Sequence, residues 1–334
     1  MGKEEMFKEL KSKKVLIDGH AHIGISPKFY YQYGYPYAMS LEDMIIRMEF
    51  LGIDYSVAFP FVDSAFYEIE LDATEIKTTT KYCSAPYEIE NKNLINEVYE
   101  IFPEYGKKIL PFFMFDPTRE TEKQVANIEM LSDKYPVYGL KTATTYIQAF
   151  VNDLETKGKP ILDFVRRKNL PMLFHSSVQP ADPWASVYDI VDFAERHPDI
   201  RVCIAHSARF TTPVLEKADQ LENCFVDLSA FIIHCKLVVD NLDSVATEDI
   251  RFPGDYTNPL SVMNDLIKKY PDTMIWGSDT PFNYWIQKFY TSDGKLSEDR
   301  LECGFKEETQ LLNSLPDNLK YKAAYTNVIK FIFG

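Results

Sequence analysis

Histidines and an aspartate follow short apolar runs at several points of this sequence. His20 and His22 stand one residue apart in the segment VLIDGHAHIG, directly after the apolar run 14–18. The other members of the set lie at the ends of later apolar runs: His175, His206 and Asp279. Imidazole nitrogens and carboxylate oxygens are ligands of Zn²⁺ and other divalent transition metals, so the set predicts a metal site.

The chemistry expected of such a site is the activation of water. Three imidazoles and one carboxylate leave an open coordination position on a divalent ion. An ion of this kind lowers the pKa of a bound water to about 7, which provides a nucleophile at neutral pH.

Each of these residues also has a structural interpretation when it is taken alone. A histidine at a strand end is more often a hydrogen-bonded structural residue than a ligand. Asp279, which follows Trp-Gly-Ser, is suited to capping a helix. A single lysine such as Lys141 is usually solvated or ion-paired. The joint placement of four histidines and one aspartate after apolar runs favours the metal site.

The elements that must position these side chains alternate between apolar runs and longer amphipathic segments. Eight runs are predicted strands: 14–18, 55–61, 109–115, 137–143, 171–177, 201–208, 224–230 and 274–280. The predicted helices are 40–53, 119–135, 160–170, 183–198, 212–223, 258–271 and 318–333. Continuous apolar runs are typical of strands covered on both faces. Eight βα units in series therefore predict a closed (β/α)₈ TIM barrel.

The carboxyl ends of barrel strands carry the catalytic groups, and the candidate residues fall at those ends. Residues two apart on a strand point to the same side, so His20 and His22 can converge on one ion. Lys141 lies near the end of the fourth predicted strand. Long loops after strand two (62–97) and strand seven (231–257) are expected at the same face. His234, within the second loop, is interpreted as a structural or rim residue.

Composition limits the partners and the location of the protein. The formal net charge of −14 argues against nucleic acid and anionic membranes as partners. No apolar run reaches the roughly 20 residues of a membrane span. The five scattered cysteines and the charged N-terminal segment predict reduced thiols, no secretory signal and a cytoplasmic location. No linker divides the chain, so residues 1–334 are predicted to form one domain with an N-terminal extension, 1–13. A small-molecule substrate and a homodimer are further expectations.

Four segments carry a resemblance to a known family: DGHAH (18–22), FHSS (174–177), IAHSAR (204–209) and WGSDTPF (276–282). They resemble the motifs of the amidohydrolase superfamily, specifically the branch that includes aminocarboxymuconate-semialdehyde decarboxylase. The end of the chain, NVIKFIFG (327–334), is similar to the end of the family's last helix. The resemblance implies a (β/α)₈ barrel with one divalent metal, usually zinc.

The resemblance also implies a role for each strand-end residue. The metal ligands would be His20, His22, His175 and Asp279. Asp279 would in addition be the general base, and His206 would polarise the substrate or move a proton. Superfamily members with two metals bridge them through a carboxylated lysine on strand four, which is the alternative role of Lys141. With one metal, Lys141 would bind a substrate carboxylate or oxyanion.

The expected function is metal-dependent hydrolysis of a C–N or C–O bond in a small amide, lactone or ester. The alternative is non-oxidative decarboxylation of a small carboxylic acid, aromatic acids included, since both reactions use the same ligands. A barrel without catalysis that serves as a binding protein is the third hypothesis. Substrate contacts are predicted for Lys141, Arg209 and Trp285. The tyrosine-rich segment 26–40 is expected to line the pocket, to form an oligomer contact, to act as a lid or to pack locally.

Overall fold

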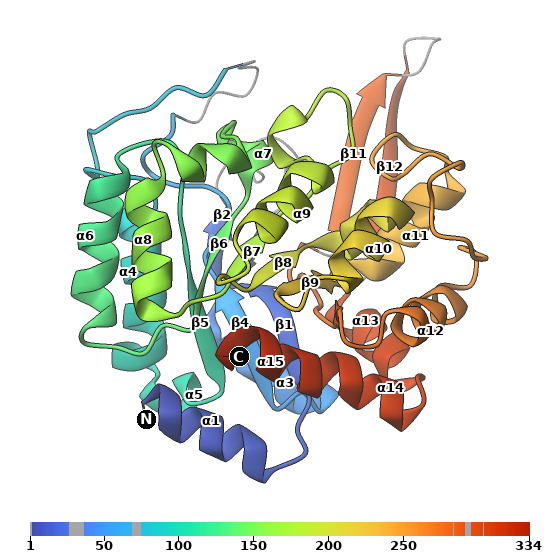
Figure 1. The fold of residues 1–334 in the computed structure, drawn as a ribbon, viewed down its shortest axis with the longest axis horizontal. Helices are drawn as coiled ribbons and strands as arrows, with labels where there is room; N and C mark the ends of the chain where they lie inside the picture. The colour runs from blue at the N-terminus through green and yellow to red at the C-terminus, as the bar shows by residue number, and fades with distance from the viewer. Residues whose placement is uncertain (1, 27–36, 69–74, 283, 291–294, 303) are drawn as a thin grey trace.

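The chain folds into a barrel of parallel strands surrounded by helices (Figure 1). The computed structural model describes residues 2–26, 37–68, 75–282, 284–290, 295–302 and 304–334, with the backbone alone at 37, 284–290 and 296–302. The barrel strands, in chain order and in spatial order, are β1 (Ile17–His22), β4 (Tyr55–Phe59), β5 (Ile109–Met114), β6 (Gly139–Thr142), β7 (Met172–Phe174), β8 (Val202–Ile204), β9 (Cys224–Asp227) and β10 (Met274–Ile275). Every neighbouring pair is parallel, which confirms the predicted (β/α)₈ barrel.

Helices cover the outside of the barrel and its amino end. They are α1 (Lys3–Ser12), α3 (Leu41–Leu51), α4 (Glu88–Ile95), α5 (Pro103–Gly106), α6 (Thr121–Ser132), α7 (Thr144–Ile147), α8 (Lys159–Lys168), α9 (Val187–Arg196), α10 (Thr212–Asp219), α11 (Phe231–Val239), α12 (Pro259–Lys269), α13 (Phe305–Asn313), α14 (Asp317–Tyr321) and α15 (Asn327–Phe333). A π-helical segment, Lys322–Thr326, joins α14 to α15, so the predicted last helix is continuous.

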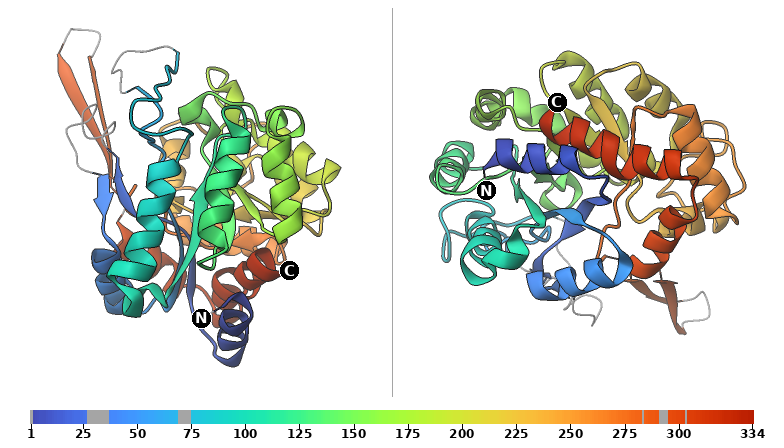
Figure 2. Two further views of the ribbon diagram at one scale, coloured as in Figure 1. Left: turned by 90° about the vertical axis from the view of Figure 1, so that its left-hand side faces the viewer. Right: turned by 90° about the horizontal axis from the view of Figure 1, so that it is seen from below.

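Alternate residues along the strands enter two different cores. Side chains such as Phe112, Leu173 and Phe225 fill the barrel interior. Their neighbours, such as Phe113 and Phe174, pack outward against the helices. At the amino end of the strands α1 and α15 lie side by side across the barrel (Figure 2, right), with the Phe7 and Phe333 rings 4.9 Å apart. The amino end is therefore closed by helices, and the candidate residues lie at the opposite end.

The first and last strands meet through backbone hydrogen bonds that close the barrel. The Gly19 amide donates to the Trp276 carbonyl at 3.0 Å, and the Asp279 amide donates to the His20 carbonyl at 2.8 Å. Two glycines permit this close approach. A Cβ on Gly19 would lie 2.8 Å from the Trp276 oxygen, and a Cβ on Gly277 would lie 2.6 Å from the His20 Cβ. The two chain segments that carry His20 and Asp279 are thus held in direct contact.

Some elements differ from the sequence-based expectation. The predicted long loop 231–257 begins with helix α11. This helix was not predicted, because its segment FIIHCKLVV is apolar on all sides and shows no helical period. Two antiparallel hairpins were not predicted: β2 (Gly24–Ser26) with β3 (Tyr37–Met39), and β11 (Tyr284–Tyr290) with β12 (Leu296–Glu302). The β11–β12 hairpin projects beyond the barrel (Figure 2, left).

Two further observations concern the described parts of the chain. None of their helices combines the length and the apolar composition that crossing a membrane requires. The four described cysteines, Cys83, Cys203, Cys224 and Cys235, are buried and form no disulfide.

The strand junction generates a stability prediction. Gly277→Ala places a methyl group against the His20 backbone, so we expect the free energy of unfolding to fall by about 1–3 kcal/mol, the usual range for overpacking. Urea unfolding measures the change. Gly2→Ala is the control, because its Cβ would meet no atom within 4 Å. An equal effect of both substitutions would contradict the role of Gly277 in closing the barrel.

Candidate metal centre

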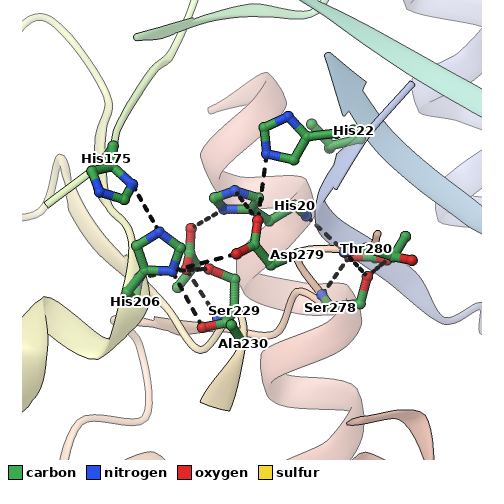
Figure 3. A network of polar contacts seen from close by, with 12 residues as sticks. His20, His22, His175, His206, Ser229, Ala230, Ser278, Asp279 and Thr280 are labelled. Atoms are coloured by element: carbon green, nitrogen blue, oxygen red, sulfur yellow. Dashed lines mark hydrogen bonds and ion pairs between the residues drawn. The ribbon is translucent and has the colours of Figure 1, made fainter. Parts of the chain in front are cut away.

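Two histidines and one aspartate converge at the carboxyl end of the barrel (Figure 3). The Nε2 atoms of His20 and His22 lie 3.2 Å and 3.4 Å from Oδ1 of Asp279. One ligand atom from each residue lies within 4.8 Å of the others, and all three side chains are buried. The junction of β1 with the segment after β10 positions them, because both histidines end β1 and Asp279 follows β10.

The protonation of His22 shows that this cluster fits a cation. Its Nδ1 lies 3.0 Å from the Pro60 carbonyl, which can only accept, so Nδ1 carries the ring proton. Burial lowers the pKa of His22 to about 4, so the ring is neutral and Nε2 holds a lone pair. That lone pair faces a carboxylate oxygen, and two acceptors face each other without a proton between them. A divalent cation satisfies both, and nitrogen and oxygen donors of this kind suit Zn²⁺.

Asp227, at the end of β9, orients His20 from behind. Its Oδ2 accepts from His20 Nδ1 at 2.8 Å, so Nε2 is the ring nitrogen that points toward the cluster. Its Oδ1 accepts from the His206 amide at 2.9 Å and from the Ser229 hydroxyl at 2.5 Å. Burial opposes ionisation of Asp227, but the charge of His20 and these hydrogen bonds outweigh it and lower the pKa of the carboxyl. A carboxylate behind a ligand histidine fixes its tautomer and raises its basicity.

The sequence analysis did not assign Asp227, although a signal was present. It lies in the predicted strand 224–230 and ends it as an acidic residue, in the same position as the other candidates. Asp18 was likewise unassigned. Its carboxylate accepts from the His20 amide and from the amide and hydroxyl of Ser278, so it ties β1 to the segment after β10. Burial raises the pKa of Asp18 to about 6.

His175 and His206 lie beside the cluster in a hydrogen-bonded chain. Arg209 Nη2 lies 3.3 Å from His175 Nε2, and a guanidinium only donates, so this nitrogen accepts. The proton of His175 therefore sits on Nδ1 and is donated to His206 Nε2 at 3.0 Å. His206 in turn donates from Nδ1 to the Ser229 hydroxyl at 2.9 Å. Burial, with the charge of Arg209, holds the pKa of both rings well below the usual range, so both are neutral.

His175 is thus engaged by two protein partners and lies outside the three-residue cluster. His206 lies closer to it, with Nδ1 4.0 Å from Asp279 Oδ2. His234, interpreted from the sequence as structural or rim, is buried on α11 and its ring stacks on His206 with centroids 4.9 Å apart. The sequence missed this contact because the helix that carries His234 was not predicted.

The turn that carries His206 and Arg209 adopts a strained backbone. Residues 206–210 all have positive φ, between 46° and 61°, although none is glycine. Left-handed conformations cost L-residues roughly 1–2 kcal/mol each. Hydrogen bonds from Ala246 and Phe252 to the Arg209 and Phe210 carbonyls hold the turn in place. Strain of this kind is typical of functional sites.

The predicted substrate-binding residues have different outcomes. Arg209 and Lys141 are both buried beside the cluster. Lys141 Nζ lies 5.2 Å from the centre of the Phe59 ring, which contacts the His20 and His22 rings at 4.9 Å and 4.6 Å. The side chain of Trp285, on β11, lies outside the described part of the structure, as do residues 27–36 of the tyrosine-rich segment.

The fold and the cluster define a (β/α)₈ barrel with a possible divalent metal site at the carboxyl ends of its strands. The sequence profile of the family described as Amidohydrolase matches residues 86–331, so the chain belongs to the amidohydrolase family. Members of this superfamily use divalent metals, and membership supports an enzymatic function. None of the curated proteins compared matches the sequence.

Solved structures resemble the chain in fold. An uncharacterized TIM-barrel protein from Bordetella bronchiseptica has a TM-score of 0.57 and 15% identity over 93% of this chain and 96% of that chain. IDCase of Metarhizium anisopliae has a TM-score of 0.50 and 14% identity over 96% and 98% of the two chains. Dihydroorotase from Campylobacter jejuni has a TM-score of 0.47 and 14% identity over 95% and 80%. At these identities the likeness shows the fold alone.

The position of Asp227 behind His20 generates a metal-affinity prediction. In Asp227→Asn the amide nitrogen replaces one acceptor oxygen and faces either His20 Nδ1 or the donors of His206 and Ser229. We expect zinc affinity, measured by competition with a chelating dye, to fall about 10- to 100-fold. Asp219→Asn is the control, because Asp219 bonds Thr273 away from the site. Unchanged affinity in Asp227→Asn would contradict the role assigned to this carboxylate.

The buried neutral histidines generate a prediction for the metal-free protein. Four rings have lowered pKa values: His22, His175, His206 and His234. The unfolded chain takes up protons at these rings below pH ~6.5, so the native state loses stability as the pH falls. His22, with a native pKa of about 4, accounts for about 3 kcal/mol of this loss.

His20 acts in the opposite direction. Burial opposes its protonation, but Asp227 and Asp279 outweigh burial and raise its pKa. Its contribution is therefore full below pH ~6.5 and is lost as the pH rises through the native pKa. Asp18, with its pKa raised to about 6, also adds stability as the pH falls. His20 and Asp18 oppose four rings whose pKa values are all lowered, so urea unfolding in chelator should show stability falling from pH 6.5 to 4.5. A rise in stability over this range would contradict the assignment of neutral rings.

Proposed function

We propose that this protein is a metal-dependent hydrolase that cleaves a C–N or C–O bond in a small amide, lactone or ester. The observation that supports it most directly is the approach of the Nε2 atoms of two histidines to one carboxylate oxygen, at 3.2 Å and 3.4 Å. The proposed cofactor is one zinc ion held by His20, His22 and Asp279. His175 is the proposed fourth ligand through Nε2, the nitrogen that accepts from Arg209 in this structure. Metal and guanidinium therefore compete for one lone pair.

Asp279 is the proposed general base. Burial opposes its ionisation, but His20 and His22 outweigh burial and hold the pKa of Asp279 well below its usual range. The carboxylate is therefore ionised at neutral pH and can accept a proton from attacking water. A bound divalent metal would supply Lewis-acid activation of that water. The same carboxyl can then return its proton to the leaving nitrogen or oxygen.

His206 is the proposed donor beside the base. Its Nδ1–H lies 2.9 Å from the Ser229 hydroxyl and 4.0 Å from Asp279 Oδ2, so it borders the space in front of the carboxylate. The ring is neutral, and the hydrogen bond from His175 keeps Nε2 as the acceptor and Nδ1 as the donor. In this structure the Nδ1–H is donated to the Ser229 hydroxyl. Turned from Ser229 to a substrate oxygen, the same donor would stabilise negative charge as it develops there. Lys141, Arg209 and Trp285 are the proposed substrate contacts.

Non-oxidative decarboxylation is the second candidate function. It is favoured by the burial of Lys141 and Arg209, whose charges suit a carboxylate substrate. IDCase is named as a decarboxylase and has a similar fold. The two reactions are separated by their products: solvent oxygen-18 enters the product of a hydrolase, and CO₂ leaves the substrate of a decarboxylase. Hydrolysis is excluded if turnover releases CO₂ and incorporates no solvent oxygen.

The role of Asp279 generates an activity prediction. The zinc-supplied protein is first screened against amides, lactones and esters to identify a substrate. Asp279→Asn keeps the shape of the side chain but removes its charge and its basicity, so we expect kcat to fall at least about 100-fold. Zinc affinity should also fall, while the thermal unfolding of the metal-free protein should still be cooperative. Asp255→Asn, at an exposed position, is the control. Normal metal content and turnover in Asp279→Asn would contradict both assigned roles.

A further inference from the structure

Two cations are buried beside the candidate metal centre, and neither forms a direct ion pair with a described residue. Lys141 and Arg209 are 1% and 8% exposed. Among the residues that the structure describes, no carboxylate lies within 4 Å of either charge. Buried charges in proteins are normally paired, because an isolated charge loses its hydration without compensation. The two side chains therefore lack the partner that a ligand could provide.

The Lys141 ammonium has no hydrogen-bond partner within the described chain. It lies 5.2 Å from the centre of the Phe59 ring, a cation–π contact that offsets only part of the lost hydration. The inward direction of the side chain follows from that contact, since the same ring touches His20 and His22. The ammonium is therefore placed at the base of the site, next to the ligand histidines.

Arg209 has neutral partners only. Its Nε donates to the Ser176 carbonyl at 2.7 Å, Nη1 donates to His234 Nε2 at 2.6 Å, and Nη2 donates to His175 Nε2 at 3.3 Å. A guanidinium carries five N–H donors, so each terminal nitrogen keeps one more donor. These two donors form the planar fork that matches a carboxylate.

The two nearby carboxylates are already engaged. Asp227 accepts from His20, from the His206 amide and from Ser229. Asp279 faces the two ligand histidines. Both carboxylates attract the charges of Lys141 and Arg209, but among the described residues neither forms a direct ion pair with them. A divalent metal would add positive charge to this set of two anions and two cations, and an anionic ligand would offset it.

We infer that the site takes a substrate with two anionic groups, one at the Lys141 ammonium and the other at the Arg209 guanidinium. The substrate class is thus a small dicarboxylate that also carries the bond to be cleaved. This inference rests on the proposed function, because the two cations flank the proposed metal ligands. It assigns each cation to a separate group of one molecule.

His234 is the positioning residue for Arg209. Its Nδ1 donates to the Ala230 carbonyl at 2.8 Å, so its Nε2 must be an acceptor and fixes Nη1 of the guanidinium. The His234 ring stacks on the His206 ring with an interplanar angle of 25°. The direction of the Arg209 fork is therefore set by α11, not by the strained turn alone.

The test measures binding of simple anions to the zinc-loaded protein by calorimetry. The probes are the straight-chain dicarboxylates from malonate to adipate and their monoamides, which match each diacid in shape but carry one charge less. We expect the best diacid to bind about 10- to 100-fold more tightly than its monoamide. In Lys141→Met and in Arg209→Met the ratio of the two affinities should fall close to one.

Thermal unfolding without ligand separates this role from a structural one. Lys141→Met removes an unpaired buried charge and keeps the apolar stem, so it should raise the unfolding midpoint. A structural lysine would instead lower the midpoint when replaced. His234→Phe keeps an aromatic ring at this position but removes the Nε2 acceptor of Arg209. It should weaken diacid binding while zinc content stays unchanged.

Three outcomes would overturn the inference. Equal affinity for diacids and monoamides would show that the site does not bind a second anionic group. An unchanged ratio in Lys141→Met would show that this cation does not bind it. Two metals per chain with a carboxylated Lys141, detected by mass, would make the lysine an anion. Retained zinc and hydrolysis with no diacid preference would defeat this inference alone. Loss of zinc binding with a persisting diacid preference would defeat the proposed function alone.

Discussion

The closure of the barrel between its first and last strands is the constraint on which the site depends. The His20 carbonyl accepts from the Asp279 amide at 2.8 Å, so a candidate ligand on β1 and another after β10 are fixed by one backbone contact. Gly19 and Gly277 allow the strands to approach, and Asp18 bonds both segments at once. The metal-binding atoms of His20 and Asp279 are therefore preorganised, because their residues form the junction between the two segments. This lowers the entropic cost of gathering these atoms around an ion.

Electrostatics then divides the site into two parts. On one side Asp227 and Asp279 are ionised and set the tautomer and charge of His20. On the other side Arg209 acts through donor contacts alone, and the donor direction passes from Arg209 to His175, to His206 and to Ser229. In both histidines of that chain Nδ1 donates and Nε2 accepts. Movement of the Arg209 guanidinium away from His175 would free the Nε2 lone pair of His175, because that nitrogen accepts from Arg209 in this structure.

Much of this architecture could be predicted from the sequence. Continuous apolar runs gave the barrel, and residues at the ends of those runs gave His20, His22 and Asp279, which the structure brings together. The rest could not be predicted because it depends on tertiary contacts. Asp227 resembles an ordinary strand-end acid until its distance to His20 is known. His234 lies on a helix that is apolar all round, which conceals its period. The competition of Arg209 for His175 arises from a left-handed turn built without glycine.

The proposed metal site holds one divalent ion between His20, His22 and Asp279. X-ray diffraction from crystals of the zinc-supplied protein, measured at the zinc absorption edge and combined with elemental analysis, can locate that ion. We expect one ion per chain and one anomalous peak bonded to His20 Nε2, His22 Nε2 and an Asp279 oxygen. A peak elsewhere, two peaks bridged by Lys141, or no zinc in protein supplied with the metal would contradict it.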